Sequence, residues 1–216
     1  MLKRTSAFTV IELLVVVAII IALAAAGMAA TTRMQAETKV VKCLNNLRTI
    51  GTAAALYSAD NAGEIPQSSH QGPAKRWQIT LPPYMGDRSD AFKSPFAANP
   101  KLSYSYAIND FLCQSPYGAE NLNFSYRQNV PAPGKTLLFT LMTASYGSTD
   151  HFHFADKEDT GYTPTAFNWQ VLTNVSQKCG HYLFLDGHVE AIPWETVKAE
   201  LVRRGSQFID PRGYQP

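Results

Sequence analysis

Length, composition and charge limit what this chain can be. It has 216 residues, 45% of them hydrophobic, and a formal net charge of +2 at pH 7. The length fits one domain of ordinary size with an appended segment, and a mean hydropathy of −0.15 excludes a polytopic membrane protein. The near-neutral charge, without a basic stretch interleaved with aromatic residues, predicts no nucleic-acid partner.

The N-terminal segment predicts a membrane-spanning helix. A short basic stretch, residues 1–7, precedes an apolar run over residues 8–30. A helix needs about 20 residues to cross a bilayer core of about 30 Å, so this run is long enough. Lys3 and Arg4 lie before the run, and the positive-inside rule therefore places the N-terminus in the cytoplasm and the residues after about 31 outside.

Glu12 is a candidate functional residue because it is a charged side chain inside this apolar run. A carboxylate in a membrane-spanning stretch costs at least about 2–3 kcal/mol unless it finds a partner. If the chain is cut after Ala7, the new α-amino group of Phe8 carries a positive charge. That amine could neutralise Glu12 in the same subunit or in a neighbour.

Residues 7–14 (AFTVIELL) resemble the processing site of type IV prepilins and type II secretion pseudopilins. The resemblance implies that prepilin peptidase cuts after Ala7 and methylates Phe8, and that Glu12 serves assembly with other pilin or pseudopilin subunits. It also implies a single-pass protein of the inner membrane whose C-terminal domain lies in the periplasm. Ala7 stands where the family usually has Gly, so we expect slower processing.

Two other interpretations of the N-terminus stay open. An ordinary secretory signal peptide also combines a basic segment, an apolar segment and small residues before the cut, here residues 24–26. A plain membrane anchor would keep residues 1–7 and would not polymerise. The apolar run is long for a signal peptide and Glu12 is out of place in one, so we favour the prepilin interpretation.

Residues 31–60 predict an amphipathic continuation of the helix. Apolar and small residues recur there at three- and four-residue steps, namely Val40, Leu44, Leu47, Gly51 and Ala54. Turn-forming residues at 60–63 predict the helix end near Ala59. Because a helix this long needs tertiary support, we expect its apolar face to pack on a globular domain.

Residues 64–216 are predicted to form an extracytoplasmic, β-rich globular domain. Residues 135–142 (KTLLFTLM) predict a buried strand, and residues 182–192 predict a β-hairpin whose Asp186-Gly187 pair forms a two-residue type I′ turn. A last helix is predicted over residues 194–203. The predicted fold class is therefore α+β, with one long N-terminal transmembrane and amphipathic helix packed on a C-terminal antiparallel β-sheet.

The hairpin also resembles a group of prepilin-like proteins that end in a His, nine further residues and Asp-Gly. Residues 183–189 (LFLDGHV) match that pattern, but Ser176 occupies the position of the His. Any role of that His therefore does not carry over. We interpret Asp186 and Gly187 as turn residues without a catalytic role, because Asp before Gly is explained by turn chemistry.

A cluster of acidic and His residues between 150 and 159 is the candidate metal site of the sequence. Its members are Asp150, His151, His153, Asp156, Glu158 and Asp159. Such side chains can hold a transition metal or Ca²⁺, and some pseudopilins bind calcium in a C-terminal loop. Since no calcium-loop spacing is present, we expect a solvated loop without a metal, with Ca²⁺ as the alternative.

The remaining candidate residues predict neither a metal site nor a catalytic site. Cys43, Cys113 and Cys179 have no metal-ligand spacing, and either a Cys113–Cys179 disulfide or three free, buried thiols is consistent with the sequence. No nucleophile with a positioned base can be assigned, so we expect no enzyme. The alternative function is a signal-anchored extracytoplasmic binding module, for example for glycans, that does not polymerise.

Overall fold

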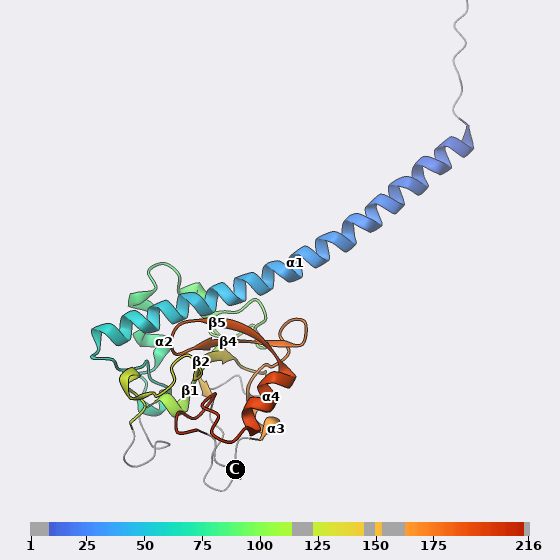
Figure 1. Ribbon diagram of the computed structural model, residues 1–216. Coiled ribbons are helices and arrows are strands. Elements are labelled where there is room, and N and C mark those ends of the chain that lie inside the picture. The colour runs from blue at the N-terminus through green and yellow to red at the C-terminus, as the bar shows by residue number, and fades with distance from the viewer. Residues whose placement is uncertain (1–8, 114–122, 145–149, 153–162, 214–216) are drawn as a thin grey trace, which may run out of the picture. The chain divides into compact units, whose positions relative to one another are not determined.

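The protein is described from a computed structural model, in which residues 9–113, 123–144, 150–152 and 163–213 are described. It has an α+β fold, with one long N-terminal helix and a five-stranded, mostly antiparallel sheet (Figure 1). The chain divides into two compact units, residues 1–40 and residues 41–216, and each is described by itself.

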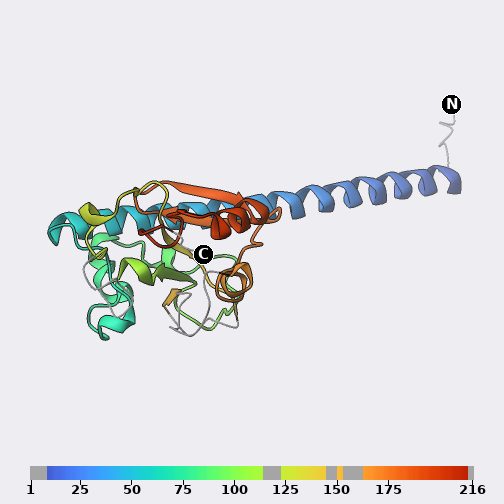
Figure 2. The same cartoon turned by 60° about the horizontal axis from the view of Figure 1, so that its bottom comes forward.

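Helix α1 (Val10–Asp60) runs unbroken for 51 residues and contributes to both units (Figures 1 and 2). Its end agrees with the predicted stop near Ala59. The chain turns there through Ala62 and Gly63, whose φ angles are 54° and 88°, and the Gly63 N–H donates to the carbonyl of Ser58 at 2.7 Å. This left-handed turn satisfies a carbonyl that the helix end leaves open.

Within residues 41–216, the last five turns of α1 bury one face. Cys43, Leu47, Ile50 and Ala53 are fully buried at three- and four-residue steps. The predicted amphipathic packing of this part of the helix on a globular domain is confirmed. A β-carbon at Gly51 would lie 2.8 Å from Cδ1 of Leu183, so the helix backbone approaches the sheet closely at this residue.

The sheet has the strand order β3-β1-β2-β4-β5. Its strands are β1 (Tyr106–Asn109), β2 (Leu137–Leu141), β3 (His151–Phe152), β4 (Cys179–Phe184) and β5 (Val189–Pro193). The pairs β1–β2, β2–β4 and β4–β5 are antiparallel, which confirms most of the predicted pattern. The edge strand β3, however, pairs with β1 in parallel, so the prediction of an antiparallel sheet was wrong for this strand.

Three α-helices accompany the sheet: α2 (Trp77–Thr80), α3 (Pro164–Gln170) and α4 (Trp194–Val202). Five 3₁₀ turns connect the described elements, namely η1 (Ser69–Gln71), η2 (Pro82–Tyr84), η3 (Ser89–Phe92), η4 (Asp110–Leu112) and η5 (Arg127–Asn129). The predicted last helix over 194–203 corresponds to α4. Helix α3 was not predicted, although the Thr163 hydroxyl accepts from the Ala166 N–H at 3.1 Å and Pro164 begins the helix.

The core lies on both faces of the sheet. One apolar cluster joins residues 41–60 of α1 to Trp77, Phe139 and Leu183, and a second joins α3 and α4 to Tyr182 and Phe184. Figure 1 accordingly shows the strands between the 41–60 part of α1 and the helices α3 and α4. Trp77 packs edge-on against Phe139 with ring centroids 5.1 Å apart, so this tryptophan belongs to the core.

The hairpin between β4 and β5 forms where it was predicted, but its turn differs. The Phe184 N–H donates to His188 O and the Gly187 N–H donates to Phe184 O, each at 3.0 Å, so three residues lie between the hydrogen-bonded pair Phe184 and His188. Gly187 has a φ of 100°, whereas Asp186 keeps a negative φ. A type I′ turn needs positive φ at both central residues, so that prediction was wrong. The Asp186 carboxylate instead accepts from the His188 N–H at 3.0 Å.

The three cysteines are free thiols in this structure. Cys43 and Cys113 are buried, and Cys179 is half-buried at the start of β4. Burial raises the pKa of both Cys43 and Cys113, which keeps these two side chains protonated and unreactive. The structure therefore favours free thiols over the Cys113–Cys179 bridge.

Candidate functional site

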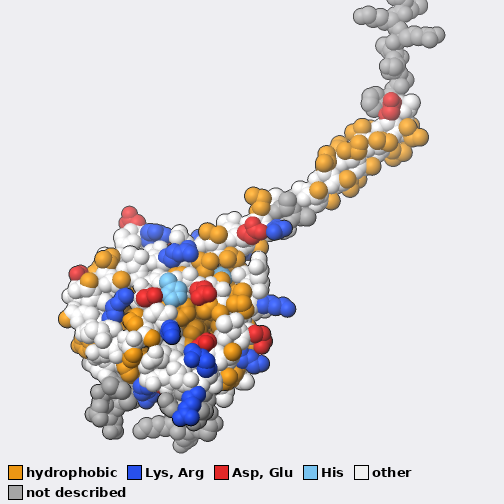
Figure 3. All heavy atoms as spheres, viewed as in Figure 1, with side chains coloured by type: hydrophobic (Ala, Val, Ile, Leu, Met, Phe, Trp, Pro, Cys, Tyr) orange, Lys and Arg blue, Asp and Glu red, His pale blue; other side chains and the backbone are white. Residues whose placement is uncertain are grey.

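The first candidate is the apolar half of α1, which is long and apolar enough to cross a membrane. From residue 10 to residue 32 its single charged side chain is Glu12, and large apolar side chains such as Ile11 and Leu23 are 71% and 68% exposed. Figure 3 shows apolar side chains along this length of helix. Charged side chains resume with Arg33, which pairs with Glu37 at 3.0 Å.

Glu12 takes part in the N-terminal cap of this helix. One oxygen of its carboxylate accepts from the backbone N–H and from the hydroxyl of Thr9, each at 2.8 Å. The Glu12 N–H donates in return to the Thr9 hydroxyl at 3.3 Å. This reciprocal pattern is a capping box, which satisfies N–H groups that the first turn of a helix leaves open.

The sequence carried the signal for this cap, a Thr three residues before a Glu at the start of an apolar run, although it was interpreted as an assembly motif alone. The cap gives Glu12 a local partner inside its own chain. The processing residues Ala7 and Phe8 lie outside the described residues.

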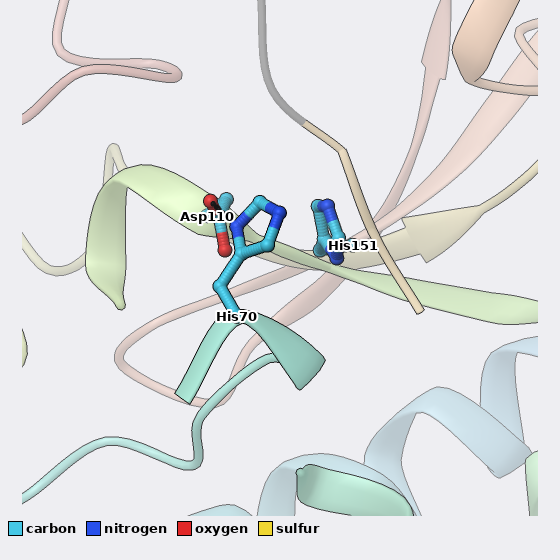
Figure 4. A group of neighbouring side chains, drawn as sticks. All are labelled: His70, Asp110 and His151. Carbon is cyan, nitrogen blue, oxygen red and sulfur yellow. Dashed lines mark hydrogen bonds and ion pairs between the residues drawn. The ribbon is translucent and has the colours of Figure 1, made fainter. Parts of the chain in front are cut away.

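The second candidate lies within residues 41–216, where three segments distant in sequence bring polar side chains together. His70 comes from η1, Asp110 from η4 at the end of β1, and His151 from the edge strand β3. One ligand atom from each of these side chains lies within 4.8 Å of the other two. We call these three residues the histidine cluster (Figure 4).

Two direct contacts hold the histidine cluster together. Nδ1 of His70 lies 2.8 Å from Oδ2 of Asp110, and the rings of His70 and His151 lie 4.1 Å apart between centroids. His70 thus contacts both other members, as Figure 4 shows. Asp110 and His151 are buried, whereas the His70 side chain is 30% exposed and gives the cluster access to solvent.

Asp150 and Ser68 lie outside the histidine cluster and form hydrogen bonds with its members. Asp150 Oδ1 lies 2.9 Å from Nδ1 of His151, and the same carboxylate accepts from the Ser69 N–H at 3.0 Å and from its hydroxyl at 2.7 Å. The Ser68 hydroxyl donates to Oδ1 of Asp110 at 2.5 Å. Both buried carboxylates therefore have hydrogen-bonded partners, as buried charges require.

The charge of Asp150 follows from these contacts. Burial on its own raises the pKa of this carboxyl, but hydrogen bonds from His151 and Ser69 outweigh burial, and the pKa is lowered. Asp150 is therefore ionised at neutral pH and faces the His151 ring as an anion.

The expectation of a solvated loop over residues 150–159 was wrong for its first two members. Asp150 and His151 are buried, at 3% and 4% exposure, because the chain here joins the edge of the sheet beside Ile108. His153, Asp156, Glu158 and Asp159 lie outside the described residues. Sequence reasoning missed His70 and Asp110 entirely, since each stands alone in its segment without a ligand-like spacing.

The pair at the hairpin tip, Asp186 and His188, forms a separate contact. Nδ1 of His188 lies 2.6 Å from Oδ1 of Asp186, and the His188 ring stacks on Phe184 with centroids 4.2 Å apart. Burial on its own raises the pKa of the Asp186 carboxyl, but the hydrogen bonds from His188 outweigh burial, and the pKa is lowered. Both side chains are about two-fifths exposed.

A comparison of the chain with protein-family models, with curated proteins and with solved structures found no match. Its function is therefore inferred from the residues and geometry of this chain.

Proposed function

We propose that the protein is a prepilin-like structural subunit that assembles through its N-terminal helix into a type IV pilus or a type II secretion pseudopilus. In this proposal it crosses the inner membrane once, prepilin peptidase cuts after Ala7 and methylates Phe8, and residues 41–216 face the periplasm. The observation that carries the proposal is the apolar segment 10–32, which is exposed over residues 10–28, has one carboxylate near its start and continues as a single helix into a β-rich unit.

An apolar helical surface of this length needs a cover, because exposed apolar patches larger than a few hundred Å² are rare on soluble monomers. The bilayer provides that cover for a single inserted subunit. Identical helices provide it in a fibre, where heterologous contacts between like subunits generate an open helical filament. A segment of this composition serves both states without a change of conformation.

The cap at Thr9 explains how Glu12 is tolerated before assembly. In an isolated subunit, the carboxylate has hydrogen-bond donors in its own chain. Cleavage after Ala7 would place a charged amine at Phe8, directly before Thr9. In the low-dielectric core of a fibre, we expect Glu12 to pair with the Phe8 amine of an adjacent subunit.

The experiment must separate capping from assembly, because a capping box alone could account for Glu12. Glu12→Leu removes both the charge and the cap acceptor, whereas Glu12→Gln keeps a capping side chain and removes the charge. Thr9→Val is the matched control, since it removes the cap hydroxyl and keeps the carboxylate. Loss of a cap costs about 0.5–2 kcal/mol, which is small beside the insertion of this apolar segment.

Sheared surface fibres are collected from cells that express each variant alone, and the subunit is quantified against the membrane pool. We expect both Glu12 variants to insert normally and to be nearly lost from fibres, while Thr9→Val assembles like the wild type. Equal losses in Thr9→Val and Glu12→Leu would show that Glu12 acts as a cap. Normal assembly of Glu12→Leu would remove the basis of the proposal.

Mass spectrometry of the membrane-extracted protein tests the processing step. We expect a mature chain that begins at Phe8 with a methylated α-amine. A new N-terminus near Ala26 would identify a secretory signal peptide, and retention of residues 1–7 would identify an anchored module that does not polymerise.

A further inference from the structure

We propose that His70, Asp110 and His151 bind a divalent first-row transition metal, with Zn²⁺ as the probe. The three side chains supply two imidazole nitrogens and one carboxylate oxygen, and one such atom from each lies within 4.8 Å of the others. Two nitrogens and one oxygen form a donor set typical of zinc sites that keep a position open for water. This site is distinct from the apolar helix that carries the proposed function.

The contact between His70 and Asp110 indicates where the metal enters. Nδ1 of His70 and Oδ2 of Asp110 are 2.8 Å apart and share a proton. With bonds of about 2.0–2.1 Å, two ligand atoms of a tetrahedral zinc lie about 3.3 Å apart, so a metal can replace that proton with a small separation of the two atoms. Because all three ligand atoms lie within 4.8 Å of one another, no pair has to close by more than about 1.5 Å for the same geometry.

His70 is the ligand side chain that can adjust most easily. Its side chain is 30% exposed on a three-residue 3₁₀ turn, whereas the Asp110 side chain is 1% exposed. Exposed side chains change rotamer on the ps–ns timescale, so an adjustment of His70 needs no change in the core. The same exposure gives the ion a path from solvent.

The surroundings of the other two ligands resemble the outer shell of a metal site. Nδ1 of His151 lies 2.9 Å from the Asp150 carboxylate, and a carboxylate on one nitrogen of a histidine is a common outer-shell partner of a metal ligand. The Ser68 hydroxyl holds Oδ1 of Asp110 at 2.5 Å, which leaves Oδ2 as the ligand oxygen. Asp150 also binds Ser69, so one carboxylate fixes both His151 and the turn that carries His70.

The donor set also decides which cations fit. Ca²⁺ and Mg²⁺ require oxygen ligands almost exclusively, and this cluster offers one ligand carboxylate beside two imidazoles. Imidazole nitrogen suits zinc, copper, nickel and iron. We therefore expect Zn²⁺ or Co²⁺ to bind and Ca²⁺ not to compete.

The test uses the full chain in detergent, purified without a polyhistidine tag. The protein is stripped with EDTA, incubated with Zn²⁺ and dialysed, and the bound zinc is measured by elemental analysis while the affinity is measured by calorimetry. Co²⁺ provides a second readout, since its visible absorption reports tetrahedral nitrogen and oxygen ligands. We expect one zinc per chain, unaffected by excess Ca²⁺.

Two variants remove one ligand each. His70→Ala changes a partly exposed side chain, and Asp110→Asn keeps the size of the buried one and an acceptor oxygen for the Ser68 hydroxyl, so both should remain folded, which thermal melting tests. Each should weaken zinc binding by more than the 10- to 100-fold that the loss of an outer-shell partner costs. His188→Ala is the matched control, because it removes an exposed histidine that also contacts an aspartate.

The proposal is supported if His70→Ala and Asp110→Asn lose the zinc and the cobalt absorption while His188→Ala keeps both. It is overturned if the wild-type chain retains no zinc after dialysis, or if folded His70→Ala binds zinc as tightly as the wild type. Neither outcome depends on fibre assembly, so the two proposals can fail separately.

Discussion

Both compact units of the chain hold carboxylates close to apolar side chains. The two units differ in how far away in sequence the hydrogen-bond donors of these carboxylates lie. In residues 1–40, Glu12 accepts its hydrogen bonds from Thr9, three residues away. In residues 41–216, Asp110 and Asp150 accept hydrogen bonds from donors as far away as 42 and 81 residues. A local cap can be exchanged for another partner while the helix remains folded, whereas the buried network forms only with the whole fold.

The same contrast holds for apolar side chains on the single helix α1. Ile20 in the first unit is 59% exposed, and Ile50 in the second unit is fully buried. Both are isoleucines in the same kind of backbone, so they differ in their surroundings alone. In the proposed function the first surface contacts a bilayer or another subunit, whereas the second stabilises the fold.

The largest expected effect comes from this pair of isoleucines. Ile50→Ala should reduce the free energy of unfolding by about 2–5 kcal/mol, because it opens a cavity between α1 and the sheet. Ile20→Ala should change it by less than about 0.5 kcal/mol in detergent. Urea denaturation followed by the fluorescence of buried Trp77 measures both values. Similar losses in the two variants would show that residues 1–40 contribute to the fold of residues 41–216.

The next effect concerns pH and again separates the units, because residues 1–40 contain no histidine. His181 in β4 is fully buried, and burial lowers its pKa from 6.5 to about 4. Between these two pH values the unfolded chain binds the proton more readily than the folded chain. The stability associated with neutral His181 is therefore complete above about pH 6.5 and is lost as the pH falls toward 4.

The slope in this window should approach 1.4 kcal/mol per pH unit, or about 3 kcal/mol across it. Urea denaturation between pH 4 and pH 7 measures the slope in the wild type and in His181→Gln, which has no titrating group at this position. We expect a clearly smaller slope in the variant. An equal slope in His181→Gln and the wild type would exclude His181 as its source.

The long helix, the strand β2, the hairpin and α4 could be predicted from sequence, because each depends on neighbours close in the chain. The period of residues 40–54 determines which face of α1 is buried, and Gly187 marks the turn. The turn type was predicted wrongly because Asp186 does not adopt the positive φ that a type I′ turn needs. Its carboxylate instead accepts a hydrogen bond from the His188 N–H.

The histidine cluster could not be predicted, because its members come from short elements joined by the fold. η1 has three residues and β3 has two, so neither shows a period. The pairing of β3 with β1 buries Asp150 and His151, although their local sequence is typical of a solvated loop. His70 and Asp110 are isolated in sequence and meet because the end of β1 lies beside η1.

The smallest expected effect sharpens the comparison at two glycines of α1. Gly51→Ala improves helix propensity by about 1 kcal/mol, but its β-carbon would lie 2.8 Å from Cδ1 of the fully buried Leu183. Overpacking costs about 1–3 kcal/mol, so we expect a net loss near 1 kcal/mol in the urea experiment. At Gly27, no heavy atom lies within 4 Å of the added carbon, and Gly27→Ala should leave the unfolding of residues 41–216 unchanged.

A double-mutant cycle identifies the cause of the loss at Gly51. Leu183→Ala alone opens a cavity at the contact, and the methyl group that Gly51→Ala adds fills part of that space in the double variant. The double variant should therefore be more stable than the sum of the single effects predicts, by about 0.5 kcal/mol or more. If Gly51→Ala instead stabilises the protein by its full helix propensity, or the two changes are additive, then α1 is not held tightly against β4. The division between an exposed and a packed half of the helix would then be less sharp than this structure indicates.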